Sequence, residues 1–166
     1  ARFECCHHKW CDLSETDGGV AILNDGKYGV GFLENQISLS LLRSPIRPDV
    51  TADMGHYSFC YRIVPHAGDP VQAGINRRAL QFNQPPIKSD VAYNGTDFVP
   101  LYLQAMKFSE DGKRIVVRLS EQDGRRGTLR LPHKVQVLNM LEDVKRETDS
   151  VDYTPFEILT LGWPVE

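Results

Sequence analysis

Residues 111–119, Asp-Gly-Lys-Arg-Ile-Val-Val-Arg-Leu, decide the fold class. From Ile115 to Leu119 every second residue is apolar, so these side chains share one face of an extended strand. The Asp111-Gly112 pair in front of them is typical of a hairpin turn, because glycine adopts the positive φ that such turns require. The stretch therefore predicts an antiparallel hairpin whose first strand lies within residues 98–108.

Runs of the same kind occur along the rest of the chain, between glycines and prolines. About nine such runs predict an all-β chain, an antiparallel β-sandwich in which two packed sheets enclose a core about 10 Å thick. The clearest other runs are residues 19–23, 28–33, 36–42, 56–64 and 155–163. Asn24-Asp25-Gly26 predicts a turn after which the chain returns along the preceding strand, and Asp123-Gly124 repeats the hairpin signal.

One segment has helical spacing. Residues 71–82 place apolar side chains at intervals of four, four and three, so these side chains lie on one side of a helix. Gly74 inside this segment weakens the helix prediction, because glycine disfavours helix interiors. Residues 44–49 contain two prolines, which cannot donate ladder hydrogen bonds, so we expect a loop there.

Composition narrows the class of protein. The 166 residues are 41% hydrophobic and 25% charged, with a net charge of -3. Lysine and arginine never occur more than twice in a row, so nucleic acid is not an expected partner. No apolar run is long enough to span a membrane. Three of the four cysteines crowd into residues 5–11, which is a poor disulfide framework, and we therefore expect a reducing, cytoplasmic location.

The segment Cys5-Cys6-His7-His8, followed by Cys11, gathers five potential metal ligands. Neighbouring side chains of a strand point to opposite faces, and structural zinc normally takes ligand pairs from separated segments. The spacing therefore argues against a metal site. His56 and His66 would lie about 33 Å apart along one unbroken strand, which disfavours a shared epimerase site. The sequence also lacks a phosphate-binding loop and a nucleophile elbow.

The loop over residues 43–53 has the richest chemistry. It holds two arginines, two aspartates and two stiffening prolines: Arg43, Arg47, Asp49, Asp53, Pro45 and Pro48. An arginine fork can bind sugar hydroxyls or a carboxylate through two hydrogen bonds. The alternative is an internal arginine and aspartate network that only stabilises a long loop. Both interpretations stay open at this point.

Many ordered blocks of the chain resemble the family 38 α-mannosidases of the cytosolic type. They include Arg2-Phe3-Glu4, His8-Lys9-Trp10, Leu23-Asn24-Asp25-Gly26-Lys27-Tyr28-Gly29, Leu39–Pro45, Ala52-Asp53-Met54-Gly55, Glu110-Asp111-Gly112 and Pro155-Phe156-Glu157-Ile158. The resemblance implies a single C-terminal domain over residues 1–166, with the β-sandwich of the galactose mutarotase-like proteins. It departs from the family at Cys5-Cys6-His7 and around residues 120–150.

The resemblance also implies a function. Such enzymes hydrolyse terminal α-mannosidic bonds with retention, through an aspartate nucleophile, a second carboxylate and a divalent metal, usually zinc. These groups lie on an N-terminal catalytic domain, and nothing in the 166 residues matches their motifs, so we expect the isolated chain to be inactive. We expect it to pack on its own catalytic domain and to lend Arg43 to the site for mannose-containing oligosaccharides, with Asp25, Asp49 and Asp53 as weaker candidates.

Two alternatives remain. A noncatalytic carbohydrate-binding module would use exposed aromatic side chains, for which Trp10, Trp163 and Tyr28 are candidates, although each could also belong to the core. A purely structural interaction domain is the third interpretation.

Overall fold

A computed structural model describes residues 4–84 and 98–165 of the chain. The chain divides into two compact units, residues 1–88 and residues 89–166, which are called unit 1 and unit 2. The described residues form eleven strands and one helix, and all strand pairs are antiparallel. The predicted all-β antiparallel class is therefore confirmed. The single domain expected over residues 1–166 stays a prediction.

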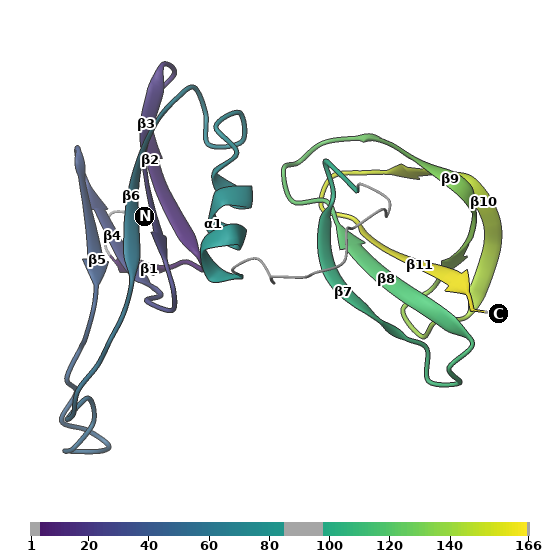
Figure 1. Cartoon of the computed structure of the whole chain (residues 1–166). Coiled ribbons are helices and arrows are strands. Elements are labelled where there is room, and N and C mark those ends of the chain that lie inside the picture. Colours follow the sequence, from purple (N-terminus) through teal and green to yellow (C-terminus); the bar gives the residue numbers. More distant parts are fainter. Residues whose placement is uncertain (1–3, 85–97, 166) are drawn as a thin grey trace, which may run out of the picture. The chain divides into compact units, whose positions relative to one another are not determined.

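Unit 1 contains two three-stranded sheets (Figure 1). The first has the order β1-β4-β5, from β1 (Glu4–Cys6), β4 (Gly29–Leu33) and β5 (Gln36–Ser40). The second has the order β2-β3-β6, from β2 (Trp10–Ser14), β3 (Gly18–Asn24) and β6 (Tyr61–Ala67). Unit 2 adds one further sheet, so the expectation of two sheets is wrong: the described residues form three.

The helix α1 (Ile75–Asn83) lies against the second sheet of unit 1, on the side of β2 and β3. It begins later than predicted because Gly74, with φ of 65°, occupies the left-handed conformation at its N-terminal cap. The helix and the sheet share a small core of five buried residues: Ala21, Leu23, Val64, Ile75 and Ala79. Within the described residues, no helix is long and apolar enough to cross a membrane.

The turn at Asn24-Asp25-Gly26 exists, but the strands on either side of it do not pair. β3 pairs with β2 and β6, whereas β4 pairs with β1 and β5. The side chain of Asn24 closes the turn instead, because its Oδ1 accepts hydrogen bonds from the backbone N–H groups of Gly26 (3.0 Å) and Lys27 (2.7 Å). A turn stabilised by a buried side chain can send the chain from one sheet to another.

The strand expected over residues 56–64 is shifted. β6 begins at Tyr61 and runs through Pro65. Proline is tolerated there because β6 is an edge strand of its sheet, where an N–H can remain without a ladder partner. The alternating aromatic residues Tyr57 and Phe59 lie outside the strand, with their rings near the ammonium group of Lys27.

Unit 2 is one five-stranded sheet in the order β10-β9-β11-β8-β7. Its strands are β7 (Tyr102–Phe108), β8 (Arg114–Ser120), β9 (Gly127–Leu138), β10 (Val144–Tyr153) and β11 (Ile158–Pro164). The predicted hairpin around Asp111-Gly112 is confirmed: β7 and β8 pair, and Gly112 has φ of 71°. The signal at Asp123-Gly124 is a turn but not a hairpin, because β11 lies between β8 and β9.

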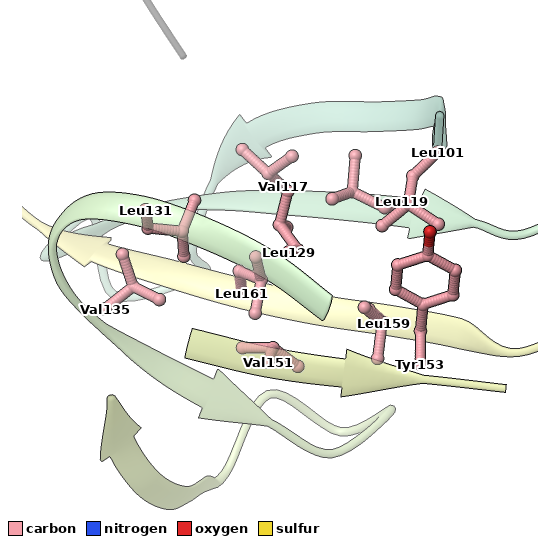
Figure 2. Close-up of a cluster of buried hydrophobic side chains, with 10 residues drawn as sticks. All are labelled: Leu101, Val117, Leu119, Leu129, Leu131, Val135, Val151, Tyr153, Leu159 and Leu161. Atoms are coloured by element: carbon pink, nitrogen blue, oxygen red, sulfur yellow. The ribbon is translucent and has the colours of Figure 1, made fainter. Parts of the chain in front are cut away.

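The sheet of unit 2 curls around ten buried residues, which Figure 2 labels. They come from β8, β9, β10 and β11 and from the residue before β7: Leu101, Val117, Leu119, Leu129, Leu131, Val135, Val151, Tyr153, Leu159 and Leu161. The predicted alternation of Val117 and Leu119 therefore marks the core face, whereas Ile115 lies at the margin with 36% of its surface exposed.

Candidate functional site

One concave surface of unit 1 lies beside a long connection. Residues 41–60, which we call the arm, join β5 to β6, contain no strand and extend beyond the two sheets (Figure 1). A groove with a volume of about 560 Å³ lies at the base of the arm. The groove is lined by polar and apolar groups, which include Glu4, Lys27, Tyr28, Arg43, Pro45 and Asp53.

Arg43, the first of the predicted site residues, is exposed to solvent. Its side chain is 78% exposed, and its Nη1 lies 3.6 Å from Oε2 of Glu4. The side chain of Glu4 lies over Gly29 of β4. A Cβ added at Gly29 would meet the Glu4 carboxylate. The absence of a side chain at Gly29 therefore leaves room for the Glu4 carboxylate to approach Arg43.

Asp53 stabilises the arm from the inside. Its Oδ2 accepts hydrogen bonds from the backbone N–H groups of Arg43 (3.3 Å) and Ser44 (2.9 Å). Ser44 and Asp53 both have positive φ, 46° and 58°, which asparagine, aspartate and glycine adopt more readily than other residues. The carboxylate thus joins the two legs of the arm and fixes the backbone, but not the guanidinium group, of Arg43.

The other two predicted aspartates do not line the groove. Asp49 accepts hydrogen bonds from the hydroxyl (2.7 Å) and the backbone N–H (2.8 Å) of Thr51, and these bonds hold the pKa of its carboxyl below the usual range. Asp25 accepts a hydrogen bond from the backbone N–H of Cys60 (2.8 Å), and its own N–H donates to the Cys60 carbonyl (3.3 Å). Asp49 therefore shapes the tip of the arm, and Asp25 ties its returning end to the turn after β3.

Sequence reasoning assigned no site role to Glu4 or Lys27 and considered Tyr28 only for a binding module, although all three stand in the blocks that carry the resemblance. Lys27 lies in the groove, with its ammonium group 5.0 Å from the ring of Phe59 and 5.9 Å from that of Tyr57. Tyr28 is 53% exposed and also lines the groove. The spacing of these residues carries no signal of the site, because the arm and the turn meet only in the folded chain.

The two histidines tested for an epimerase site have different surroundings. His66 is buried, with Nε2 2.6 Å from Oδ2 of Asp12 and Nδ1 3.1 Å from the carbonyl oxygen of Gly68. His56 is exposed on the arm. His66 is therefore a structural group that joins β6 to β2 inside unit 1.

In the segment Cys5-Cys6-His7-His8, the His7 side chain makes contacts with neighbouring residues of unit 1. His7 Nε2 lies 2.7 Å from the amide nitrogen of Asn24, and its Nδ1 lies 3.1 Å from the carbonyl oxygen of Tyr28. Burial raises the pKa of the Cys11 thiol to about 11. In the part of the chain that the structure describes, no three histidine, cysteine, aspartate or glutamate residues gather where they could hold a metal ion.

Comparison with known proteins shows the family. Residues 1–51 match the glycosyl hydrolases family 38 C-terminal domain, and residues 100–161 match the glycosyl hydrolases family 38 C-terminal beta sandwich domain. The two matches fall in unit 1 and unit 2 respectively. The chain therefore belongs to the C-terminal region of the family 38 glycosyl hydrolases.

Its curated relatives are α-mannosidases. Alpha-mannosidase G of Dictyostelium discoideum is 37% identical over 186 residues, which cover 96% of this chain and 17% of the relative. Alpha-mannosidase 2C1 of Mus musculus is 49% identical over 85 residues, 51% of this chain and 8% of the relative. Alpha-mannosidase of Saccharomyces cerevisiae is 42% identical over 104 residues, 61% of this chain and 10% of the relative. The chain thus spans 17% or less of the length of these relatives.

Proposed function

We propose that the chain is the C-terminal part of an α-mannosidase that hydrolyses terminal α-mannosidic bonds with retention. The names of its curated relatives and the two family matches support the assignment to an α-mannosidase. In this proposal the chain packs on its own catalytic domain, and the arm brings Arg43 to the site that binds mannose-containing oligosaccharides. The proposed location is the cytoplasm, in agreement with four cysteines that are all free.

The catalytic groups belong to the catalytic domain. Retention requires a nucleophilic carboxylate and an acid–base carboxylate about 5–5.5 Å apart. A divalent metal, for which we propose zinc, would supply charge to hold the sugar hydroxyls on that domain. In this proposal the described residues of this chain contribute to binding, because the groove offers hydrogen-bond donors and an exposed aromatic ring.

The observation that carries the proposal is the contrast between the backbone and the side chain of Arg43. Asp53 holds its backbone N–H, whereas its side chain is 78% exposed in the groove. A guanidinium group on a fixed backbone can donate several hydrogen bonds to neighbouring hydroxyls and loses less conformational freedom than it would on a mobile backbone. Glu4 at 3.6 Å keeps the group oriented without occupying all its donors.

Replacement of Arg43 in the full-length enzyme tests this role. Loss of a charged hydrogen-bond donor predicts that Arg43→Ala lowers kcat/KM for an α-mannoside by about 10- to 100-fold. Arg47→Ala is the matched control, because Arg47 is an exposed arginine of the same arm that does not line the groove. Equal kinetics for the two variants would contradict the role of Arg43.

The isolated chain provides a second test of the proposal. Incubated with a chromogenic α-mannoside and added zinc, it should release no product, whereas its full-length parent should be active. Hydrolysis by the 166 residues alone would mean that the chain carries catalytic groups of its own.

One observation favours a carbohydrate-binding module as the alternative. Tyr28 presents an exposed ring in the groove, whereas Trp10 and Trp163 pack against the cores of their units. Titration of the isolated chain with mannose oligosaccharides separates the two functions. Binding with a Kd below about 1 mM that is lost in Tyr28→Ala would favour the module. Absence of binding agrees with an arm that completes a site built on another domain.

A further inference from the structure

The arm has little structure of its own to define where Arg43 lies. Residues 41–60 make no strand pairing, and the bonds at its tip are local, such as those between Asp49 and Thr51. The position of Arg43 therefore depends on the contacts that anchor the two legs of the arm to the rest of unit 1. Asp53 joins the legs to each other, but it does not attach them to a sheet.

Lys27 provides such an attachment for the returning leg. It follows β3 in the turn that Asn24 closes, and its backbone N–H donates to Asn24 Oδ1 at 2.7 Å. Its ammonium group lies within 6 Å of the ring centroids of Tyr57 and Phe59, the range in which a cation is attracted to an aromatic face. Among the described residues no carboxylate lies within 4.0 Å of this ammonium group.

The same residue lines the groove that residues of the first leg also line. Lys27 and Arg43 line one cavity, together with Pro45 and Asp53 of the arm. The turn after β3 thus contacts the returning leg, and Asp25 in this turn adds two hydrogen bonds with the backbone of Cys60. A shift of the aromatic leg would move Asp53, and with it the backbone of Arg43.

We propose that Lys27 is a positioning residue for Arg43, which acts through the rings of Tyr57 and Phe59 and through Asp53. The inference rests on the proposed function, because it assigns the arm's sugar contact to Arg43. Lys27 thus sets substrate affinity without contact to the reacting atoms. Its cation, rather than the length of its side chain, carries this role.

The test uses the full-length enzyme with Lys27→Met, Lys27→Arg, Arg43→Ala and the double variant Lys27→Met/Arg43→Ala. Loss of two partly exposed cation–π contacts predicts that Lys27→Met lowers kcat/KM by about 3- to 10-fold, mainly through KM. Lys27→Arg keeps the cation and should stay near the wild type. The double variant should be no worse than Arg43→Ala, because Lys27 acts through Arg43.

The outcomes separate this inference from the function on which it rests. Normal kinetics of Lys27→Met, with a defect in Arg43→Ala, would overturn the role of Lys27 and leave the proposed function intact. An equal loss from Lys27→Met in both backgrounds would also overturn it. Normal kinetics of Arg43→Ala would contradict the proposed function itself, and the positioning role with it.

A second pair of variants keeps the test decisive if Lys27→Met does not fold. Phe59→Leu removes the nearer ring and should lower kcat/KM to a similar degree as the loss of the lysine charge. Tyr61→Leu is the control, because Tyr61 is a neighbouring aromatic residue, 54% exposed, that begins β6 and does not line the groove. An unchanged kcat/KM in a folded Phe59→Leu variant would overturn the inference.

Discussion

The two units of the chain are stabilised in different ways. Unit 2 encloses ten buried residues within one curled sheet (Figure 2). Among the described residues of unit 1, the apolar core cluster has five members, two of them alanine, and buried polar groups such as Asn24, His66 and Asp12 add hydrogen bonds. Apolar burial is not directional, whereas hydrogen bonds place particular atoms. The unit that contains the candidate groove is thus the one in which polar contacts determine the local geometry.

The largest effect should come from the core of unit 2. Leu161 is fully buried, and Leu161→Ala should lower the free energy of unfolding by about 2–5 kcal/mol, because it leaves a cavity in a packed core. Leu141 is 84% exposed, so Leu141→Ala should change the free energy of unfolding by less than about 0.5 kcal/mol. Denaturant unfolding of the chain measures both, and similar values would contradict the assignment of the core.

The next largest loss of stability should come from removing a buried polar side chain of unit 1. Asn24 is fully buried, and Asn24→Ala leaves the N–H groups of Gly26 and Lys27 without their acceptor, which should cost about 1–3 kcal/mol. Asn139 of unit 2 makes the same kind of turn, with its Oδ1 accepting from Leu141 and Asp143, but at a more exposed position.

Asn139→Ala is therefore the matched variant for Asn24→Ala. Water can replace the lost acceptor at an exposed turn, so this substitution should cost less than about 1 kcal/mol. Thermal unfolding of the two variants, followed side by side, gives the difference. Equal losses of stability would show that burial does not distinguish the two turns.

A smaller, pH-dependent effect on the stability of unit 2 is expected from Glu121. Burial alone would raise the pKa of its carboxyl, but hydrogen bonds from the backbone N–H groups of Phe156, Asp123, Arg125 and Gly124 outweigh burial and lower it. A lowered pKa in the folded state contributes stability that is present above the unfolded value near 4.5 and is lost as the pH falls through the folded value.

Glu121→Gln should consequently destabilise unit 2 by about 1–2 kcal/mol at neutral pH, because an amide offers one acceptor oxygen in place of two. The difference between variant and wild type should shrink below pH 4.5, where the wild-type carboxyl also becomes protonated. Unfolding curves at a series of pH values measure this trend. A constant difference across the series would argue against the carboxylate as its cause.

The smallest effect on stability is expected from His7 in unit 1. Burial lowers its pKa, with a further contribution from His8, and the hydrogen bond with the Tyr28 carbonyl opposes the shift only in part. The unfolded chain therefore binds more protons below pH 6.5, and stability falls as the pH drops from 6.5 through the lower folded value.

His7→Gln should remove this part of the acid sensitivity, and His133→Gln, at an exposed position of β9, is the matched control. The melting temperature between pH 7 and pH 5 is the measurement. The same pH dependence in wild type and His7→Gln would show that another group is responsible.

Strands with clear alternation were predictable, and polar strands were not. β8 follows from its alternating Ile115, Val117 and Leu119, and its hairpin follows from Asp111-Gly112. β10 was missed, because most of its side chains are exposed and charged or polar, so only pairing with β9 makes it a strand. The pairing of β3 with β4 was predicted wrongly, because a turn motif carries no information on which sheet receives the next strand.

The candidate site was predictable only in part. The residue types of the arm pointed to Arg43 and Asp53, and both line the groove. Asp25 and Asp49 do not, because their carboxylates satisfy nearby backbone N–H groups. Lys27 and Glu4 could not be assigned to the site beforehand, since each approaches the arm from a distant part of the sequence.

The amino-acid sequence by itself determined the all-β class, the family, the hairpin at Asp111-Gly112 and the loop that carries Arg43, because these depend on local alternation, turn residues and ordered blocks. Only the tertiary structure decided that the described residues form three sheets rather than two, and that Lys27 and Glu4 line one groove with residues of the arm. The physical reason is that sheet membership and side-chain contacts depend on residues far apart in the chain, whose approach no local pattern records.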